Sequence, residues 1–433
     1  MESHRPPNIL YLHVHDAGRQ VQPYGAPVPT PHLQQLAEQG VLYRQAFCAN
    51  PTCSASRSAL LTGTYPHCNG MLGLAHRGFR LNDYRWHLCH LLKSAGYHTA
   101  LAGVQHLAHA ATTEITELGY DEILTTASDF DQPVQAAADF FRSAKSRPFF
   151  LSVGFSAPHR DARESFSSNR PPPNPHYVRP PAILPDTPET RADFAAYSAS
   201  MTSVDESMGR VLAALAEQGL AENTLVIATT DHGVAFPEMK CNLTDHGIGV
   251  YLIMRGPGGF TGGQVNDDLV SQIDIVPTVL EVAGIACPPH VQGRSMRQGP
   301  PRESIFAEVN VHAAIEPMRA VRTKRWKYIR RYAATPQRVL PNCDNSPSKT
   351  LWHEAGWAQQ PVAAEELYDL MLDPMERRNL ATDPAHEDTR ADMAARLRTW
   401  QIETNDPILH GPLQLPPEAV VAPPHKYSPH DLS

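Results

Sequence analysis

Short apolar runs alternate with stretches of helical periodicity along most of the chain. The runs are NILYLHV at 8–14, YHTALAGV at 97–104, RPFFLSVGF at 147–155, TLVIATT at 224–230 and VYLIMRG at 250–256. Between them lie PHLQQLAEQG, the segment after Cys53 and ADFAAYSASMTSVDESMGRVLAALAEQG, whose apolar residues follow helical spacing and which end on glycine. Apolar runs of strand length separated by helices predict an α/β fold with a mainly parallel, doubly wound sheet flanked by helices.

The pattern changes at about residue 300. AVRTKRWKYIRRY alternates as a β-strand does, and after a loop-rich stretch come ELYDLMLDPMERRNLA and a polar helix near 386–402. We therefore predict an α/β domain over residues 1–300 and a smaller α+β subdomain, with an antiparallel sheet and a tail, over residues 301–433. The loops 160–190 and 333–362 are predicted to run over the surface as candidate pocket walls.

Histidine or aspartate follows four of the predicted strands, in HVHD, GVQH, SAPH and TTDHG. In an open parallel sheet, reactive groups gather beyond the carboxyl ends of the strands. We therefore expect these side chains to meet at one edge of the sheet.

Composition narrows the class of protein. The formal net charge of −8 and the lack of a basic stripe argue against a nucleic-acid partner, and no stretch approaches the roughly 20 apolar residues of a membrane helix. The start, MESHRPPNILYLHVHD, has no export-signal pattern, which predicts a cytoplasmic protein. Seven scattered cysteines do not form the pattern of a disulfide framework, so most are expected to be small buried side chains.

The sharpest local feature is Cys53-Ser54-Ala55-Ser56-Arg57, which precedes SALLTGTYPH and opens a predicted helix. These residues resemble the signature C-x-[P/A]-x-R of the formylglycine sulfatases, within the alkaline phosphatase superfamily. The resemblance implies that Cys53 is oxidised to formylglycine by a formylglycine-generating enzyme and hydrated to a diol, one oxygen of which attacks sulfur. An ordinary buried thiol is the alternative.

The resemblance spans nearly the whole chain. TPHLQQLAEQGVLYRQAF, AGYHTALAGVQH and ELYDLMLDPMERRNLA are similar to blocks of the sulfatase family. Among its branches the chain most resembles heparan N-sulfatase, a hydrolase of S–N bonds, in SAPHR, in TPETRAD before a long helix and in TWQIETNDP. The resemblance implies an alkaline-phosphatase-like fold and a homodimer.

A metal site is the second element that the resemblance implies. In the family, two adjacent aspartates after the first strand and a later Asp-Asn pair hold a calcium ion that also touches the formylglycine. The matching positions here are His15-Asp16 and Asp231-His232, with Cys53 as the further ligand. Because imidazole suits transition metals better than Ca²⁺, we predict one divalent ion, Mn²⁺ or Zn²⁺, with Ca²⁺ less favoured. A core histidine is the alternative interpretation of His15.

Four more residues match family positions. The resemblance implies that Arg57 fixes the diol or a sulfate oxygen, and that His106 helps remove the formylglycine proton. It also implies that His159 serves the leaving group as a general acid and that Lys240 binds sulfate and leaving group. Surface or core roles are the alternatives for these side chains.

One family position departs from the pattern. Where the family has Gly-Lys-x-His, this chain has Val104, so the lysine that binds a sulfate oxygen is absent. Either the site tolerates less positive charge or another group, such as His246 or Arg77, takes its place. His13, on the same strand face as His15, is predicted to be structural.

These observations favour a hydrolase that releases inorganic sulfate from a small sulfamate, with an S–N bond, or from a sulfate ester. A phosphonate monoester or phosphodiester hydrolase on the same scaffold is the alternative, since such relatives also use formylglycine and an Asp-His metal pair. A non-catalytic binding protein is a third interpretation. Retention of the cysteine, the arginine and both metal acids argues against it.

Overall fold

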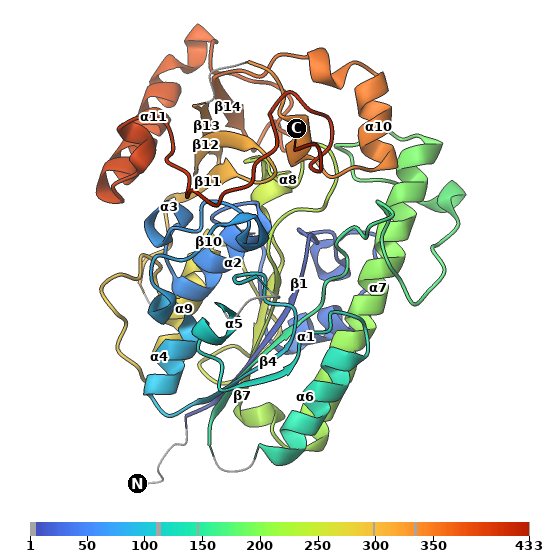
Figure 1. Cartoon of the computed structure of the whole chain (residues 1–433), viewed down its shortest axis with the longest axis vertical. Helices are drawn as coiled ribbons and strands as arrows, with labels where there is room; N and C mark the ends of the chain where they lie inside the picture. The colour runs from blue at the N-terminus through green and yellow to red at the C-terminus, as the bar shows by residue number, and fades with distance from the viewer. Residues whose placement is uncertain (1–5, 110–113, 145–146, 298, 333–335, 433) are drawn as a thin grey trace.

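The computed structural model describes residues 6–109, 114–144, 147–297, 299–332 and 336–432 (Figure 1). Its main sheet has eight strands in the spatial order β5 (Glu122–Thr125), β4 (His98–Gly103), β6 (Phe149–Gly154), β1 (Asn8–Val14), β7 (Thr224–Thr230), β8 (Leu252–Arg255), β2 (Val41–Tyr43) and β9 (Gln264–Asn266). The central strand β1 pairs in parallel with β6 and β7, whereas β8 runs antiparallel to β7 and β2. The predicted mainly parallel α/β sheet is confirmed.

Helices cover both faces of this sheet. One face carries α1 (Pro31–Gln39), α6 (Gln132–Ser143) and α7 (Pro188–Glu217), and the other carries α2 (Cys53–Thr62), α4 (Leu88–Ser94) and α9 (Ile275–Val282). Strand β1 contributes Ile9 and Tyr11 to one core and Leu10 and Leu12 to the other. Every residue of β1 is buried, which explains why its sequence is apolar without alternation.

Several shorter elements connect these strands and helices. They are β3 (Ala46–Phe47), which pairs with β10 (Val270–Ser271), and the helices α3 (Pro66–Asn69), α5 (Glu114–Glu117), α8 (Asp245–Ile248) and α10 (Pro347–Glu354). The long helix α7 begins earlier than its apolar pattern suggests. Thr187 and Thr190 form a capping box that starts the helix at Pro188.

A separate four-stranded antiparallel sheet forms the C-terminal part of the chain. Its strands are β11 (Ile305–Val311), β12 (Ile315–Arg322), β13 (Trp326–Arg331) and β14 (Glu365–Asp369), and α11 (Glu387–Glu403) packs on one face. The segment AVRTKRWKYIRRY, predicted as one strand, is split between β12 and β13. The hydroxyl of Thr323 accepts the N–H of Trp326 at 2.9 Å and so closes the turn between them.

The other face of this sheet packs on the core that contains α2 and α9. The C-terminal sheet is thereby held beside the N-terminus of α2 (Figure 1). Among the described residues, no helix is both long and apolar enough to cross a membrane.

A buried charge cluster joins α3 to the C-terminal sheet. His67 pairs with Glu308 of β11 through Nδ1, and its backbone N–H donates to Glu308 Oε1 at 2.8 Å. Arg319 of β12 lies 3.9 Å from the same carboxylate and makes hydrogen bonds of 2.7 and 2.8 Å to Asp406. Burial opposes the charged imidazole, but the Glu308 carboxylate raises the pKa of His67 to about 10.

We expect His67→Gln to lower the free energy of unfolding by about 1–3 kcal/mol near neutral pH, because it removes the nearer cation and leaves the buried Glu308 carboxylate with only Arg319, 3.9 Å away. The pKa of His67 is higher in the folded chain than in the unfolded chain. Its stabilising contribution is therefore complete below pH 6.5 and is lost as the pH rises toward about 10. Urea denaturation of both proteins from about pH 6 to about pH 10 measures the difference.

The matched control is His98→Gln, because His98 and Glu122 form a solvent-accessible pair at 3.6 Å, with 34% and 53% of their side chains exposed. A penalty for His67→Gln that is as small as that of the control, or that does not shrink at alkaline pH, contradicts this account of the cluster.

Candidate active site

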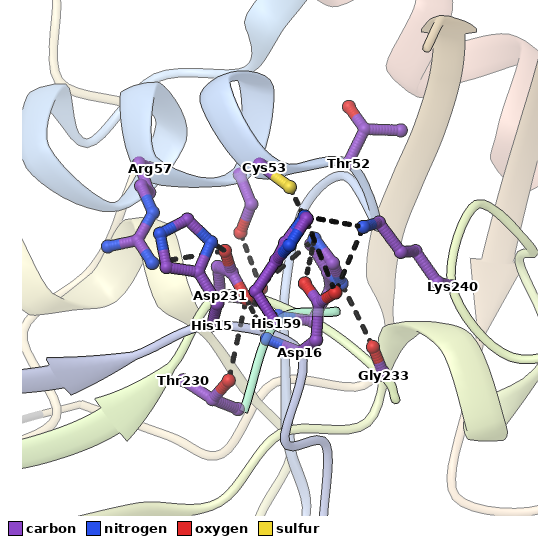
Figure 2. A network of polar contacts seen from close by, with 12 residues as sticks. His15, Asp16, Thr52, Cys53, Arg57, His159, Thr230, Asp231, Gly233 and Lys240 are labelled. Atoms are coloured by element: carbon purple, nitrogen blue, oxygen red, sulfur yellow. Dashed lines mark hydrogen bonds and ion pairs between the residues drawn. The ribbon is translucent and has the colours of Figure 1, made fainter. Parts of the chain in front are cut away.

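Four strand ends and one helix start bring the candidate residues together (Figure 2). His15 and Asp16 follow β1, and Asp231 and His232 follow β7. His106 follows β4, and His159 lies five residues beyond β6. Cys53 is the first residue of α2, and Arg57 lies one turn later on the same helix. The expectation that the strand-end residues meet at one edge of the sheet agrees with this arrangement.

Asp231 is a buried carboxylate that contacts several of the other candidate residues. It is 2% exposed and accepts the backbone N–H groups of Asp16 and His232, each at 2.9 Å. Arg57 Nη2 lies 3.1 Å and His15 Nδ1 lies 3.3 Å from its Oδ2 atom. Burial alone would raise the pKa of Asp231, but His232, Arg57 and His15 hold it well below its usual range.

Arg57 is buried and is held from three sides. Besides Asp231, its guanidinium contacts His13 Nδ1 at 2.6 Å and donates to the carbonyl of Val14 at 2.9 Å. His13 in turn lies 3.1 Å from the Ser152 hydroxyl through Nε2. Arg57 is 1% exposed, so these contacts fix α2 against the ends of β1 and β7.

Cys53 lies where α2 presents its unpaired backbone N–H groups, a position whose partial positive charge favours anions. Its Sγ is 3.3 Å from His232 Nε2. Burial raises the pKa of the Cys53 thiol well above its usual range. In this environment an unmodified cysteine is protonated at neutral pH and is a poor nucleophile.

Several ligand atoms converge beside Cys53. One ligand atom from each of His15, Asp16, Cys53 and Asp231 lies within 4.8 Å of the others, and His15 and Cys53 form a second such group with His106. His15 Nδ1 and Asp16 Oδ1 are buried and make no hydrogen bond, although Asp231 Oδ2 lies 3.3 Å from the first atom and His232 Nε2 lies 3.5 Å from the second. Burial and Arg57 lower the pKa of His15, which keeps its imidazole neutral. Buried acceptors without donors and a neutral imidazole form a donor set that fits a divalent metal ion.

Two of these residues adopt the left-handed backbone region, Asp16 with φ of 48° and His106 with φ of 64°. Such conformations are costly for residues other than glycine and are found where a side chain must point in a required direction. Here both turn a side chain back toward Cys53.

Lys240 lies between two carboxylates rather than on the surface of the cleft. Its Nζ is 2.9 Å from Asp16 Oδ2 and 2.9 Å from Asp344 Oδ2, and 3.5 Å from His159 Nε2. Burial would lower the pKa of Lys240, but Asp16 and Asp344 raise it well above its usual range. Asp344 belongs to the C-terminal part of the chain, so Lys240 connects the cluster of candidate metal ligands to that part.

The position of the missing lysine is occupied by Val104, close to His106. His106 stacks on His76 with ring planes 1° apart, and their Nε2 and Nδ1 atoms lie 3.3 Å apart. Of the two proposed replacements, Arg77 borders the same cleft, where it donates to the carbonyls of Val420 and Pro429. His246 lines a different cavity, so it does not replace the lysine.

A cleft of about 320 Å³ opens above Cys53 between the main domain and the C-terminal part. His106 and His159 line it with the start of the predicted loop 160–190, whereas the far wall comes from His312, Asp344 and Asn345. The sequence alone does not identify His312 or Asp344, because neither follows a strand of the main sheet nor belongs to a catalytic motif. Their position depends on how the two sheets pack.

Comparison with known proteins agrees with this architecture. The family model described as Sulfatase matches residues 7–285, and the model described as "N-sulphoglucosamine sulphohydrolase, C-terminal" matches residues 239–351. The chain is 30% identical to N-sulphoglucosamine sulphohydrolase of Homo sapiens over 464 aligned residues, covering 94% of this chain and 92% of that protein.

Two solved structures share the fold at lower identity. One is a protein in complex with its substrate D-glucosamine-2-N,6-O-disulfate, with a TM-score of 0.71, 19% identity and coverage of 94% of this chain and 99% of that one. The other is a phosphonate monoester hydrolase from Silicibacter pomeroyi, with a TM-score of 0.68, 20% identity and coverage of 92% and 96%.

We expect Arg57→Met to lower the free energy of unfolding by about 3–5 kcal/mol in metal-free protein, because it leaves the buried Asp231 carboxylate without its guanidinium. Urea denaturation in the presence of a chelator measures this change. Arg44→Met is the matched control, since Arg44 pairs with Asp267 at 3.1 Å on the surface, where both side chains are more than half exposed. Equal stability of the two variants would show that Arg57 does not hold the site together.

Proposed function

Because the chain belongs to the sulfatase family of hydrolases, we propose that it releases inorganic sulfate from a small sulfamate or sulfate ester, with residue 53 as a formylglycine. The observation that carries this proposal is the place of Cys53. It is the first residue of α2, at the floor of the cleft, among His15, His106, Asp16 and Asp231. A hydrated formylglycine there supplies the oxygen nucleophile that a protonated buried thiol lacks.

His159, His106 and Lys240 have separate proposed roles in proton transfer and charge stabilisation. His159 borders the cleft with 33% of its side chain exposed, so it can reach a leaving nitrogen or oxygen and protonate it as the S–N or S–O bond breaks. His106 lies against residue 53 and accepts the proton released when the aldehyde is regenerated. Its pKa is lowered by burial and by Arg57, which keeps a nitrogen free to accept that proton. The N-terminus of α2 favours the negative charge of the sulfate group, and Lys240 adds positive charge from behind the cleft surface, where it lies between Asp16 and Asp344.

We propose that His15, Asp16, Asp231 and His232 hold one divalent ion together with residue 53, and that the ion is Mn²⁺ or Zn²⁺. His15 Nδ1 and Asp16 Oδ1, which are buried and make no hydrogen bond, support this site, and His232 Nε2 borders it 3.5 Å from Asp16 Oδ1. When bound, such an ion withdraws charge from sulfate oxygens and favours an ionised nucleophile. Two imidazoles among the ligands favour a transition metal over Ca²⁺.

An S–N bond is the favoured target, since the chain resembles the human N-sulphoglucosamine sulphohydrolase over nearly its whole length. The second candidate function is hydrolysis of phosphonate monoesters or phosphodiesters. The Asp231-His232 pair favours it, and a phosphonate monoester hydrolase shares the fold. The two functions differ in their products: a sulfatase releases inorganic sulfate, whereas a phosphonate monoester or phosphodiester hydrolase releases an alcohol together with a phosphonate or a phosphate monoester.

The nucleophile is tested by mass spectrometry of the peptide that contains Cys53, from protein co-produced with a formylglycine-generating enzyme. We expect the aldehyde mass, and a fall in sulfate release of about a thousandfold or more for Cys53→Ala, because the covalent route is lost. Cys89→Ala is the control, since Cys89 is equally buried but lies on α4. Full activity with an unmodified thiol, or release of the alcohol from a phosphonate monoester or phosphodiester with no sulfate release from the sulfur substrates, would favour a metal phosphohydrolase instead.

The metal is tested by restoring an all-oxygen ligand set. We expect His15→Asp combined with His232→Asn to shift the ratio of Ca²⁺ to Mn²⁺ or Zn²⁺ affinity toward Ca²⁺ by about tenfold or more, or about 1.4 kcal/mol. Competition experiments followed by elemental analysis of the protein measure this ratio without any activity assay. Unchanged preference in the double variant would rule out the two histidines as metal ligands.

A further inference from the structure

A second cavity lies between the main domain and the C-terminal sheet. It has a volume of about 380 Å³, and the side chains that line it include Arg19, Gln45, His246, Arg322 and Lys324. Arg19 comes from the loop after β1, and Arg322 and Lys324 come from the end of β12 and the turn that follows it. Among the described residues, this cavity shares no lining residue with the cleft of the candidate active site. The proposed catalytic chemistry therefore does not account for it.

Positive charge is in excess around this cavity. Arg322 and Lys327 lie 2.9 and 2.6 Å from Asp245, and Lys327 also lies 3.0 Å from Glu376. Arg19 forms an ion pair with no carboxylate in the described part of the chain. Burial raises the pKa of Glu376 to about 7, so this carboxylate is only partly charged at neutral pH. Three cations are therefore balanced by less than two negative charges.

The guanidinium group of Arg19 is held in place by contacts that leave part of it unsatisfied. Its Nη2 donates to the carbonyl of Ala46 at 2.8 Å, and its Cζ lies 4.4 Å from the centre of the Phe47 ring. Arg322 lies over the same ring at 4.3 Å. The Nε atom of Arg19 is buried and has no hydrogen-bond partner. The ring thus holds two guanidinium groups near the cavity without supplying a negative charge to either.

Two more residues of the cavity wall have a buried polar atom without a partner. Gln45 Oε1 and His246 Nε2 make no hydrogen bond. Such atoms are rare in folded proteins and indicate a missing ion, water or ligand. Burial lowers the pKa of His246 to about 4, so its imidazole is neutral at pH 7 and offers one N–H. The amide of Gln45 can turn to offer its NH₂ group. Both side chains can therefore donate to an anion.

We propose that this cavity binds a small tetrahedral oxyanion, inorganic sulfate or phosphate, through Arg19 together with Arg322 and Lys324. Gln45 and His246 supply further donors. Guanidinium groups match such oxyanions in charge and in the direction of their N–H bonds. The volume of about 380 Å³ lies within the range of about 300–1,000 Å³ for ligand pockets, so the anion enters with water or with a small group attached. The site does not rest on the proposed function.

The cavity shares a loop with the candidate metal ligands. Arg19 follows Asp16 by three residues, and the N–H of Gly18 donates to the carbonyl of His232 at 2.8 Å. An anion bound at Arg19 therefore stabilises backbone that also positions two of those ligands.

The test measures anion binding without an activity assay. Cys53→Ala protein is kept in a chelator, so that no metal draws anions to the cleft. It is titrated calorimetrically with sodium sulfate and separately with sodium phosphate, at constant ionic strength in sodium chloride. We expect both anions to bind and Arg19→Met to weaken their binding by about tenfold or more, because a guanidinium group that lacks a carboxylate partner is removed.

Lys324→Met is a second variant, at the rim of the cavity, where 60% of the lysine side chain is exposed and its loss leaves the fold intact. We expect it to weaken the binding of both anions by about threefold or more, because one positive charge is lost. Arg142→Met is the control and should leave binding unchanged. Arg142 pairs with Asp139 on the exposed side of α6 and does not line the cavity.

The position of the anion is tested in crystals grown with selenate, whose anomalous signal should lie beside Arg19. A signal in the cleft alone would overturn this second site. Binding that is lost in Arg77→Met but kept in Arg19→Met and Lys324→Met would do the same, since Arg77 borders the cleft. Equal heats of binding with sodium chloride alone would show a diffuse positive potential and no site.

The two anions distinguish the source of the ligand. Tighter binding of sulfate would identify the product of the proposed reaction as the ligand, and tighter binding of phosphate would identify a cellular phosphate. Either result supports the site. None of these measurements uses sulfate release, so the failure of the anion site and the failure of the proposed function are observed separately.

Discussion

The structure depends on keeping two carboxylates charged at the buried carboxyl edge of a parallel sheet. Asp16 and Asp231 are 0% and 2% exposed, and an isolated carboxylate at such a depth is strongly destabilising. Two cations compensate them from opposite sides, Arg57 from α2 and Lys240 from the loop after β7. Each cation is itself buried, so neither can be lost without leaving a charge unpaired.

This requirement explains why the C-terminal part of the chain is close to the site. Lys240 lies 2.9 Å from both Asp16 and Asp344, so the cluster of candidate metal ligands and the cleft wall share one ammonium group. A second cluster, in which Arg322 and Lys327 of the C-terminal sheet bind Asp245 of α8, holds the same two parts together nearby. The packing of the C-terminal sheet against the main domain therefore sets the position of the far wall of the cleft, which His312, Asp344 and Asn345 form.

The sequence predicts the position of a strand best where burial on both faces alone determines its residues. The bounds of β1 and β7 agree with their apolar runs because both strands are buried on both faces. The convergence of His15, Asp231 and Cys53 follows from sheet topology and from a local motif. The turn between β12 and β13 was missed because Thr323 closes it with a side-chain hydroxyl inside a run that alternates like one strand. Asp344 could not be found, since its role depends on packing between segments about a hundred residues apart in sequence, as Lys240 and Asp344 are.

The proposed metal site differs from the pattern of the resembled family in two charges of opposite sign. In the resembled family, three aspartates and one asparagine hold the metal, and a lysine stands where this chain has Val104. Here His15 replaces one of those aspartates, so one negative charge and one positive charge are absent together. Burial and Arg57 lower the pKa of His15, and an imidazole that binds a metal is neutral, so His15 adds no compensating charge. The summed charge of the candidate metal ligands and of the residue at position 104 is then the same in this chain as in the family pattern. The absence of the lysine therefore gives no reason to regard the site as inactive, because a lysine beside a neutral His15 would give the proposed sulfate site one positive charge more than the family pattern has.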